Sequence, residues 1–191
     1  MKLYELVLMF DATLSTEKYS EVLSAVLLTL WDSCVIQETD DMGILPMAYA
    51  LWAIKSKTYA HLISYKISID PTALKPALAA MRYIAGLERV FFYSMSATQP
   101  FLYYKDVLIQ TEKLLATTAT GTAARKKSNL LNTAAGKALV HRKAALFLRK
   151  FITRFDEIKP RKYSNHTVSL QKKLRVMVIR SRELGMLAYI K

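Results

Sequence analysis

The chain has 191 residues, and its 28 Lys and Arg against 15 Asp and Glu give a formal net charge of +13. Hydrophobic residues make up 52% of the chain, enough for a buried core, which excludes a largely disordered protein. One cysteine excludes an internal disulfide framework, and three histidines without a Cys/His cluster argue against a zinc site. We therefore expect no metal and no cofactor.

A membrane span is not expected either. The longest apolar run without charges covers residues 42–54, which is shorter than the roughly 20 residues that a span needs. Residues 1–10 indicate a strand rather than a targeting segment. The sequence thus predicts no membrane among the partners of the chain.

The charge is divided unevenly along the chain. Residues 1–105 carry 9 Lys or Arg and 10 Asp or Glu, whereas residues 106–191 carry 19 and 5. Such a concentration of like charge repels itself unless a counter-charge is present. The basic part therefore predicts a polyanionic partner, with nucleic acid first and an anionic membrane surface second.

The near-neutral part begins with a strand, a helix and a second strand. Residues 3–10 are apolar or aromatic except for Glu5 and predict a buried strand. Ser15 is an N-cap residue, and the apolar spacing after it predicts a helix over about 15–31. The second strand is expected to begin near residue 34, to break at 40–43 and to resume at 48–51.

A third strand, a second helix and a fourth strand follow. Residues 58–69 alternate with period 2, which predicts a long strand with one apolar face. The second helix is expected to begin at 70–71 or at Lys75 and to end at Gly86, before a strand over 90–95. The order β-α-β-β-α-β predicts an α+β fold of the ferredoxin-like type, a four-stranded antiparallel sheet with two helices on one face.

The basic part predicts a linker followed by helices. Residues 106–140 are rich in Thr, Ala and Lys and are expected to form a linker, with a helical turn or two at 107–115. A helix is predicted over 141–155, a loop that contains Pro160 over 156–166, and a last helix over 167–185.

Several short runs near the C-terminus occur in the order and spacing of one ribosomal family. They are Phe151-Ile152, Ile158 to Lys162, Gln171 to Leu174, Ile179 to Arg182 and Leu187 to Tyr189. With these runs, residues 141–191 resemble bacterial-type small-subunit ribosomal protein eighteen. Ser164-Asn165 stands where that family usually has Thr-Gly, Ala188 replaces its proline, and Glu157 replaces a usual lysine.

The near-neutral part resembles a second family, small-subunit ribosomal protein six. The runs that carry this resemblance are Tyr4-Glu5, the turn at 42–45, Ala48-Tyr49, the strand at 59–69, Arg89-Val90 and residues 99–102. Proteins six and eighteen form a heterodimer on the platform of the bacterial small subunit. Together the resemblances imply a fused, non-enzymatic constituent of the small ribosomal subunit, which acts in translation and has rRNA and neighbouring ribosomal proteins as partners.

The resemblances also imply a division of the chain. Residues 1–105 are expected to form the ferredoxin-like domain, 106–140 the basic linker, and 141–191 the helical rRNA-binding module docked in cis on the first domain. A fusion of two proteins that bacteria usually make separately favours an organellar, mitochondrial ribosome, with the bacterial cytoplasm as the alternative. No small-molecule substrate is expected.

The cations of the basic module are the predicted RNA contacts. They are Arg149, Lys150, Arg154, Lys159, Arg161, Lys162, Lys172, Lys173, Arg175, Arg180 and Arg182. Arg161 and Lys162 come first among them, because a turn fixed by Pro160 can hold both side chains and Arg can bind phosphate bidentately. His141 and His166 flank the module and are further candidates for RNA contact. The contact between the modules is predicted to involve Leu148, Phe151, Ile152, Phe155, Phe101 and Tyr104.

Two other classes of protein fit the sequence less well. A small phosphatase on a ferredoxin-like fold would need a Gly-rich phosphate loop, and the chain has 5 Gly and no such loop, so no catalytic residue is predicted. A non-ribosomal RNA-binding protein of the four-stranded-sheet type is the alternative function. Residues 90–93 lack the Gly-Phe signature of that module.

Overall fold

The computed structural model describes residues 1–31, 34–50, 58–96, 99–119, 130–164 and 166–189. The chain forms two compact units, and each unit is built from two separate segments of the sequence. Unit 1 comprises Met1–Pro46 and Lys57–Leu102, and unit 2 comprises Met47–Ser56 and Tyr103–Lys191. Among the described helices, none is both long enough and apolar enough to cross a membrane.

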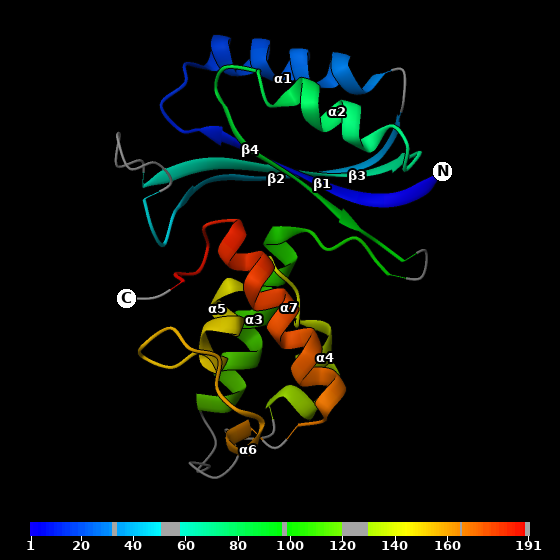
Figure 1. Cartoon of the computed structure of the whole chain (residues 1–191). Coiled ribbons are helices and arrows are strands. Elements are labelled where there is room, and N and C mark those ends of the chain that lie inside the picture. The colour runs from blue at the N-terminus through cyan, green and yellow to red at the C-terminus, as the bar shows by residue number, and fades with distance from the viewer. Residues whose placement is uncertain (32–33, 51–57, 97–98, 120–129, 165, 190–191) are drawn as a thin grey trace. The chain divides into compact units, whose positions relative to one another are not determined.

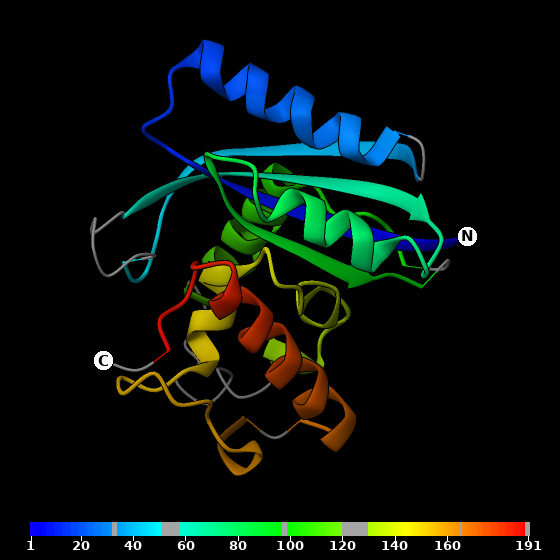
Figure 2. The same cartoon turned by 45° about the horizontal axis from the view of Figure 1, so that its top comes forward.

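Unit 1 is a four-stranded antiparallel sheet with two helices. Its strands are β1 (Lys2–Asp11), β2 (Cys34–Pro46), β3 (Tyr59–Ile69) and β4 (Leu87–Ser94), in the spatial order β2-β3-β1-β4. Helices α1 (Thr16–Trp31) and α2 (Leu74–Met81) lie on the same face of the sheet (Figure 1, Figure 2). This architecture confirms the predicted α+β, ferredoxin-like fold of the N-terminal part.

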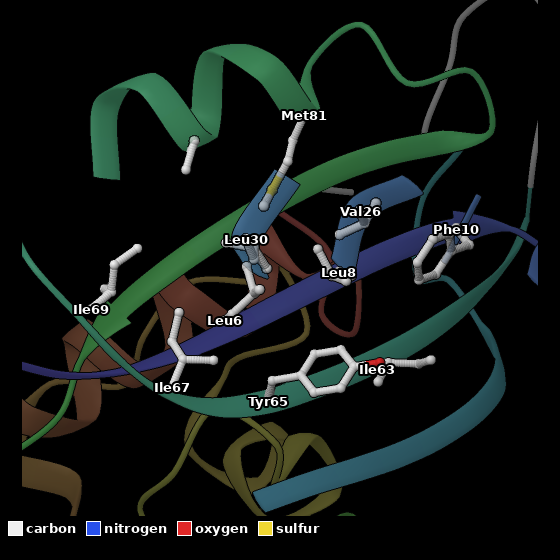
Figure 3. Close-up of a cluster of buried hydrophobic side chains, with 11 residues drawn as sticks. Leu6, Leu8, Phe10, Val26, Leu30, Ile63, Tyr65, Ile67, Ile69 and Met81 are labelled. Carbon is white, nitrogen blue, oxygen red and sulfur yellow. The ribbon is translucent and has the colours of Figure 1, made fainter. Parts of the chain in front are cut away.

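The core of unit 1 lies between that face and the two helices. Strand β1 is central and pairs with both β3 and β4, so that Leu6 lies opposite Tyr65 on one side and Phe92 on the other. Alternate residues of β1 and β3 meet Val26 and Leu30 from α1 and Met81 from α2 (Figure 3). The strand residues are Leu6, Leu8, Phe10, Ile63, Tyr65, Ile67 and Ile69. Burial of each large apolar side chain stabilises the fold by about 1.5–3 kcal/mol.

Strand β2 differs from its prediction. It continues through residues 40–43 to Pro46, with register shifts between Ile36 and Glu38 and between Asp41 and Gly43. Gly43 has a positive φ of 74°, and its N–H donates to Asp41 Oδ1 at 2.8 Å. The polar residues that resemble a turn in the sequence therefore form a bulge within one strand, because a bulge accommodates an extra residue without ending the pairing. Of the expected continuation at 48–51, the described residues 48–50 are not strand.

Unit 2 contains the helices α3 (Tyr104–Ala119), α4 (Ala134–Ala138), α5 (Ala145–Leu148), α6 (Arg161–Ser164) and α7 (Val168–Glu183), and the 3-10 turn η2 (Arg149–Phe151). Helix α5 packs against both α3 and α7. Helix α4 and all but the first two residues of α3 fall within residues 106–140, where the sequence predicts a linker with a helical turn or two. Residues 120–129 of that segment lie outside the described residues.

Helix α3 is longer than its composition suggests. Val107 and Thr111 are one helical turn apart and are both buried. The hydroxyl of Thr111 donates to the carbonyl oxygen of Val107 at 2.7 Å, which satisfies its hydrogen bond inside the helix. A Thr-rich segment can therefore bury one face even though its mean hydropathy is low.

The helix predicted over 141–155 is replaced by shorter elements. The chain turns at 141–144, where the Ala144 N–H donates to the His141 carbonyl at 3.0 Å, and helix α5 begins only at Ala145. After η2 the backbone of Ile152 is extended and forms an isolated antiparallel bridge with Ile158. A tight loop thus interrupts what the sequence predicts as one helix.

Helix α7 agrees with the predicted span of 167–185. The Thr167 hydroxyl caps its start by accepting the Leu170 N–H at 3.3 Å. Gly185, with a φ of 72°, follows its end in the left-handed conformation that suits glycine. The buried side of the helix is formed by Leu170, Leu174, Met177, Val178 and Ser181.

We expect Leu8→Ala to lower the free energy of unfolding by about 2–5 kcal/mol, because it opens a cavity in the core of unit 1. Leu8 is fully buried, whereas Ile44 is 60% exposed. The matched control Ile44→Ala should therefore change the free energy of unfolding by no more than about 0.5 kcal/mol. Urea denaturation of both variants checks this, and equal losses would contradict the assigned core.

Candidate nucleic-acid interface

The predicted RNA-binding cations lie on several elements of unit 2. Those with exposed side chains are Arg149, Lys150, Arg154, Arg161, Lys162, Lys172, Lys173 and Arg175. Lys159, Arg180 and Arg182 are half-buried. The exposed members lie on η2, on the loop after it, on helix α6 and on the outer side of α7, so they do not form a single row.

One open cleft of about 590 Å³ gathers some of these groups. It lies where α4, α6 and the start of α7 come together, and we call it the basic cleft. Its described lining residues are Asn132, Lys137, Arg161, Lys162, His166 and Thr167. None of these is acidic. The basic cleft contains the two cations that the sequence placed first, together with Lys137, which lies in the predicted linker and was not a candidate.

The chain that enters α6 is held by backbone contacts. The Lys159 N–H donates to the Phe151 carbonyl at 2.9 Å, and the Lys159 carbonyl accepts the side-chain amide of Gln171 at 3.2 Å. The ammonium of Lys159 donates to the Lys150 carbonyl at 2.8 Å. Pro160 follows and fixes the backbone before α6, as the sequence predicts for the turn that presents Arg161.

His166 is the most enclosed residue of the basic cleft. Its side chain is only 4% exposed, and its Nε2 atom is hydrogen-bonded to Gln171 Oε1. Because the Gln171 amide nitrogen donates to the Lys159 carbonyl, its oxygen faces the imidazole and accepts from Nε2–H. The Nδ1 atom of His166 is buried and has no hydrogen-bond partner among the described residues.

The start of α7 adds positive potential to the basic cleft. Thr167 lines the cleft and caps the helix, and its hydroxyl accepts the Leu170 N–H. The N–H groups of Val168 and Ser169, in the first turn, have no partner within the helix. The aligned peptide dipoles of a 16-residue helix place about half a positive charge at this end. Three cations and a helix N-terminus therefore face a cleft whose described lining has no carboxylate.

The position of Lys137 depends on Gly136. Helix α4 is capped by Thr133, whose hydroxyl accepts the Gly136 N–H at 3.0 Å. A Cβ atom on Gly136 would overlap the carbonyl oxygen of Leu130. Only glycine allows the two backbone segments to approach this closely, and this approach sets the helix that carries Lys137.

The side chain of Arg182 makes hydrogen bonds inside unit 2. Its Nε donates to the Ala188 carbonyl at 2.9 Å, and its Nη2 donates to the Asp156 carbonyl. The carbonyl of Arg182 accepts the Tyr49 hydroxyl at 2.7 Å. The guanidinium also lies 5.8 Å from the centre of the Tyr189 ring. This residue, predicted as an RNA contact, therefore links the C-terminal segment to the loop before α6.

Two neighbouring cations are buried, which the periodicity of the sequence does not reveal. Arg142 is 2% exposed and Lys143 is 1% exposed. Burial, with the charge of Arg180 as a second cause, lowers the pKa of Arg142 to about 9. Both belong to the turn at 141–144 instead of a solvated helix face.

The same surroundings act on His141. Burial first, and then the charges of Lys143, Lys173 and Arg180, lower the pKa of His141 to about 3. Its Nδ1 atom accepts the Lys143 N–H at 3.3 Å, which requires an unprotonated nitrogen. At neutral pH His141 therefore carries no charge to offer a phosphate.

The residues predicted for a contact between the modules have different surroundings. Leu148, Phe151 and Ile152 are buried, and the Phe151 ring packs edge-on against Phe147 with centroids 5.2 Å apart. Phe155 is 59% exposed, and the Arg154 guanidinium lies 4.6 Å from the centre of its ring. Phe101 belongs to unit 1 and is buried, and Tyr104 belongs to unit 2 and is half-buried. The predicted stripe thus divides into buried residues and one exposed aromatic ring.

No protein-family model and no curated protein sequence matches the chain. Among solved structures it is similar to 30S ribosomal protein S6 from Thermotoga maritima, with 14% identity, a TM-score of 0.44, and coverage of 60% of this chain and 97% of that chain. It is also similar to the C-terminal domain of the MgtC protein from Mycobacterium tuberculosis, with 12% identity, a TM-score of 0.35, and coverage of 53% and 95%. At these identities and TM-scores, neither likeness assigns a function.

No group of three or more His, Cys, Asp and Glu residues in the described part of the chain is placed to hold a metal ion.

The depressed pKa of His141 predicts a pH dependence of stability. The unfolded chain takes up a proton on this residue as the pH falls below its usual pKa of 6.5, whereas the folded chain does so only near pH 3. The free energy of unfolding should therefore decrease as the pH is lowered, and His141 should account for about 2 kcal/mol of this decrease between pH 7 and pH 5. His141→Gln should show a shallower fall in urea titrations at the two pH values. Identical pH dependence in the two proteins would refute the assignment.

The close approach of Gly136 to Leu130 predicts that a side chain at this position destabilises unit 2. Gly136→Ala should lower the free energy of unfolding by about 1–3 kcal/mol, because the added methyl group meets a backbone oxygen that cannot move aside freely. The control Ala135→Ser, at an exposed position of the same short helix, should cost about 0.5 kcal/mol or less. Thermal and urea unfolding compare the two. A neutral Gly136→Ala variant would show that the close approach to Leu130 is dispensable.

Proposed function

We propose that the chain is a non-enzymatic constituent of the small ribosomal subunit and that unit 2 binds the rRNA of the platform. The observation that carries the proposal is the excess of exposed cations on unit 2, together with the three cations that line a cleft with no described acidic lining residue. The ferredoxin-like fold of unit 1 and the ordered runs that resemble ribosomal proteins six and eighteen support the same assignment.

The physical basis of this binding would be counterion release. Residues 106–191 carry 19 Lys or Arg against 5 Asp or Glu, and eight of the eleven predicted contacts are exposed. RNA phosphates that meet such a surface release condensed counterions, so affinity falls steeply as salt rises. For about 6–8 neutralised phosphates, the logarithm of the affinity should fall with the logarithm of the salt concentration at a slope of about −5 to −7.

We also propose that the two units dock on each other within the chain. Helices α1 and α2 lie on one face of the sheet, and strand alternation places Val7, Met9 and Leu62 on the other. An apolar sheet face needs a cover in water, and a unit of the same chain has a high effective concentration. Docking in cis would give this face the partner that separate six-like and eighteen-like proteins find by diffusion.

The compartment is part of the proposal. A fused six-like and eighteen-like chain favours a mitochondrial ribosome, and the bacterial cytoplasm is the alternative. The partners would then be the small-subunit rRNA and neighbouring small-subunit proteins.

Sedimentation in a high-magnesium gradient tests the proposed function. We expect the tagged chain to travel with the small subunit in its native cells and to recover small-subunit rRNA after crosslinking. Arg161→Gln with Lys162→Gln should weaken RNA binding and flatten the salt slope without changing the unfolding transition, because both side chains are exposed. Recovery from the top of the gradient with other RNAs would instead favour a non-ribosomal RNA-binding protein.

A further inference from the structure

We propose that the basic cleft holds a single nucleotide of an RNA chain, with its phosphate against Lys137, Arg161 and Lys162 and its ribose 2′-hydroxyl donating to His166 Nδ1. The inference deepens the proposed function, because it takes RNA as the source of the phosphate. It adds Lys137, His166 and the start of α7 to the surface, and it makes one point of contact selective for ribose.

The positive charges that line the basic cleft indicate where the phosphate of the nucleotide lies. Lys137 comes from α4, and Arg161 and Lys162 come from α6, so the three cations reach the cleft from two separate elements. A guanidinium can bind a phosphate through two parallel hydrogen bonds, which fixes its orientation as well as its position. With no described carboxylate in the lining, an anion would relieve the repulsion between Lys137 and Arg161.

The start of α7 supplies neutral donors to the same anion. The Thr167 hydroxyl accepts the Leu170 N–H. The N–H groups of Val168 and Ser169 are therefore without partners in the helix. Helix N-termini bind phosphates through such groups and through the helix dipole. A helix end alone would bind many anions. A second feature of the cleft limits which anionic ligands fit.

That second feature is His166. Its Nε2–H donates to Gln171, so Nδ1 is the acceptor nitrogen of this tautomer, and this buried atom has no hydrogen-bond partner among the described residues. A buried polar atom without a partner costs about 1–3 kcal/mol. A phosphodiester carries no proton to donate, whereas the 2′-hydroxyl next to it does, and this hydroxyl distinguishes RNA from DNA.

The size of the basic cleft suits this ligand. Pockets for small ligands are typically about 300–1,000 Å³, and the cleft has about 590 Å³. It is open on one side, as a nucleotide within a longer chain requires, since the strand must enter and leave. Asn132 lines the same space.

Binding of the full chain to a single-stranded RNA and to a DNA of the same sequence tests the proposal. The wild type should prefer RNA by roughly fivefold, the equivalent of one net hydrogen bond. His166→Gln keeps a donor near the place of Nε2 but removes Nδ1, and should bind both strands almost equally. His166→Asn, which keeps a polar atom near Nδ1, should retain more of the preference. An unchanged RNA preference in His166→Gln would overturn the ribose contact.

The phosphate end is tested with a charge-matched pair of double variants. Lys137→Gln with Arg161→Gln should weaken RNA binding about tenfold and lower the salt slope by about one to two. Lys105→Gln with Lys113→Gln removes the same charge from the exposed side of α3, outside the predicted RNA contacts, and should cost less than threefold. Equal losses in the two pairs would show a diffuse basic surface with no defined site.

Inorganic phosphate tests whether the anion in the basic cleft comes from RNA or is free phosphate. In amide NMR spectra of the full chain, phosphate should shift the Val168 and Ser169 signals, and RNA should displace it. Phosphate binding that RNA does not displace would make the cleft a site for free phosphate and overturn the RNA assignment.

The sedimentation experiment and these binding measurements test different proposals, so one proposal can be refuted while the other stands. A chain that leaves the small subunit but passes the binding tests would refute the ribosomal role and keep the cleft. A chain that sediments with the subunit, while both double variants behave alike, would refute only the cleft.

Discussion

Repulsion among like charges is the constraint that unit 2 has to satisfy. Residues 106–191 carry 19 basic and 5 acidic side chains, so carboxylates cannot neutralise most of the cations. The unit places apolar residues such as Leu174 and Val178 on the inner side of α7 and turns Lys172 and Arg175 outward. Water and counterions screen the outward charges, and the buried apolar area must outweigh the repulsion that remains.

Two cations of unit 2, Lys159 and Arg182, donate hydrogen bonds to backbone carbonyl groups. Lys159 donates to the carbonyl of Lys150, and Arg182 donates to those of Ala188 and Asp156. A carbonyl satisfies the donor geometry but cancels no net charge. The side chains are thereby fixed in place while the positive potential stays available for an external anion, which is the state that a pre-organised phosphate surface requires.

The extent to which the sequence predicted this molecule differs between the units. The alternation of residues 58–69 predicts β3 and its buried face, because one hydrophobic face of a strand is a local pattern. The bulge at Gly43 was missed, since polar residues inside a strand resemble a turn. In unit 2 the last helix was predicted from its periodicity. Of helix α3 only a helical turn or two at 107–115 was predicted, because its Thr and Lys residues resemble a linker, whereas Thr111 satisfies its hydroxyl by bonding back along the helix.

The candidate site shows the same division. Arg161 and Lys162 are adjacent in the sequence and follow a proline, so a local argument finds them. Lys137 reaches the basic cleft from α4 only because Gly136 packs against Leu130, and such a contact between segments leaves no periodic signal. The acceptor role of His166 Nδ1 depends on the chain of hydrogen bonds through Gln171 to Lys159, which also exists only in the folded chain.

The short segment after β2 has a consequence for how the protein is made. Ala48 donates its N–H to the carbonyl of Gly185 at 2.7 Å, and Tyr49 donates its hydroxyl to the carbonyl of Arg182, so residues from the first half of the chain belong to the last unit. On the translating ribosome these residues emerge long before α7 and cannot acquire their partners until synthesis is nearly complete. A fragment that starts at residue 103 lacks both donors. The C-terminal end of α7 would then lose two hydrogen bonds, and no single cut of the chain separates the two units intact.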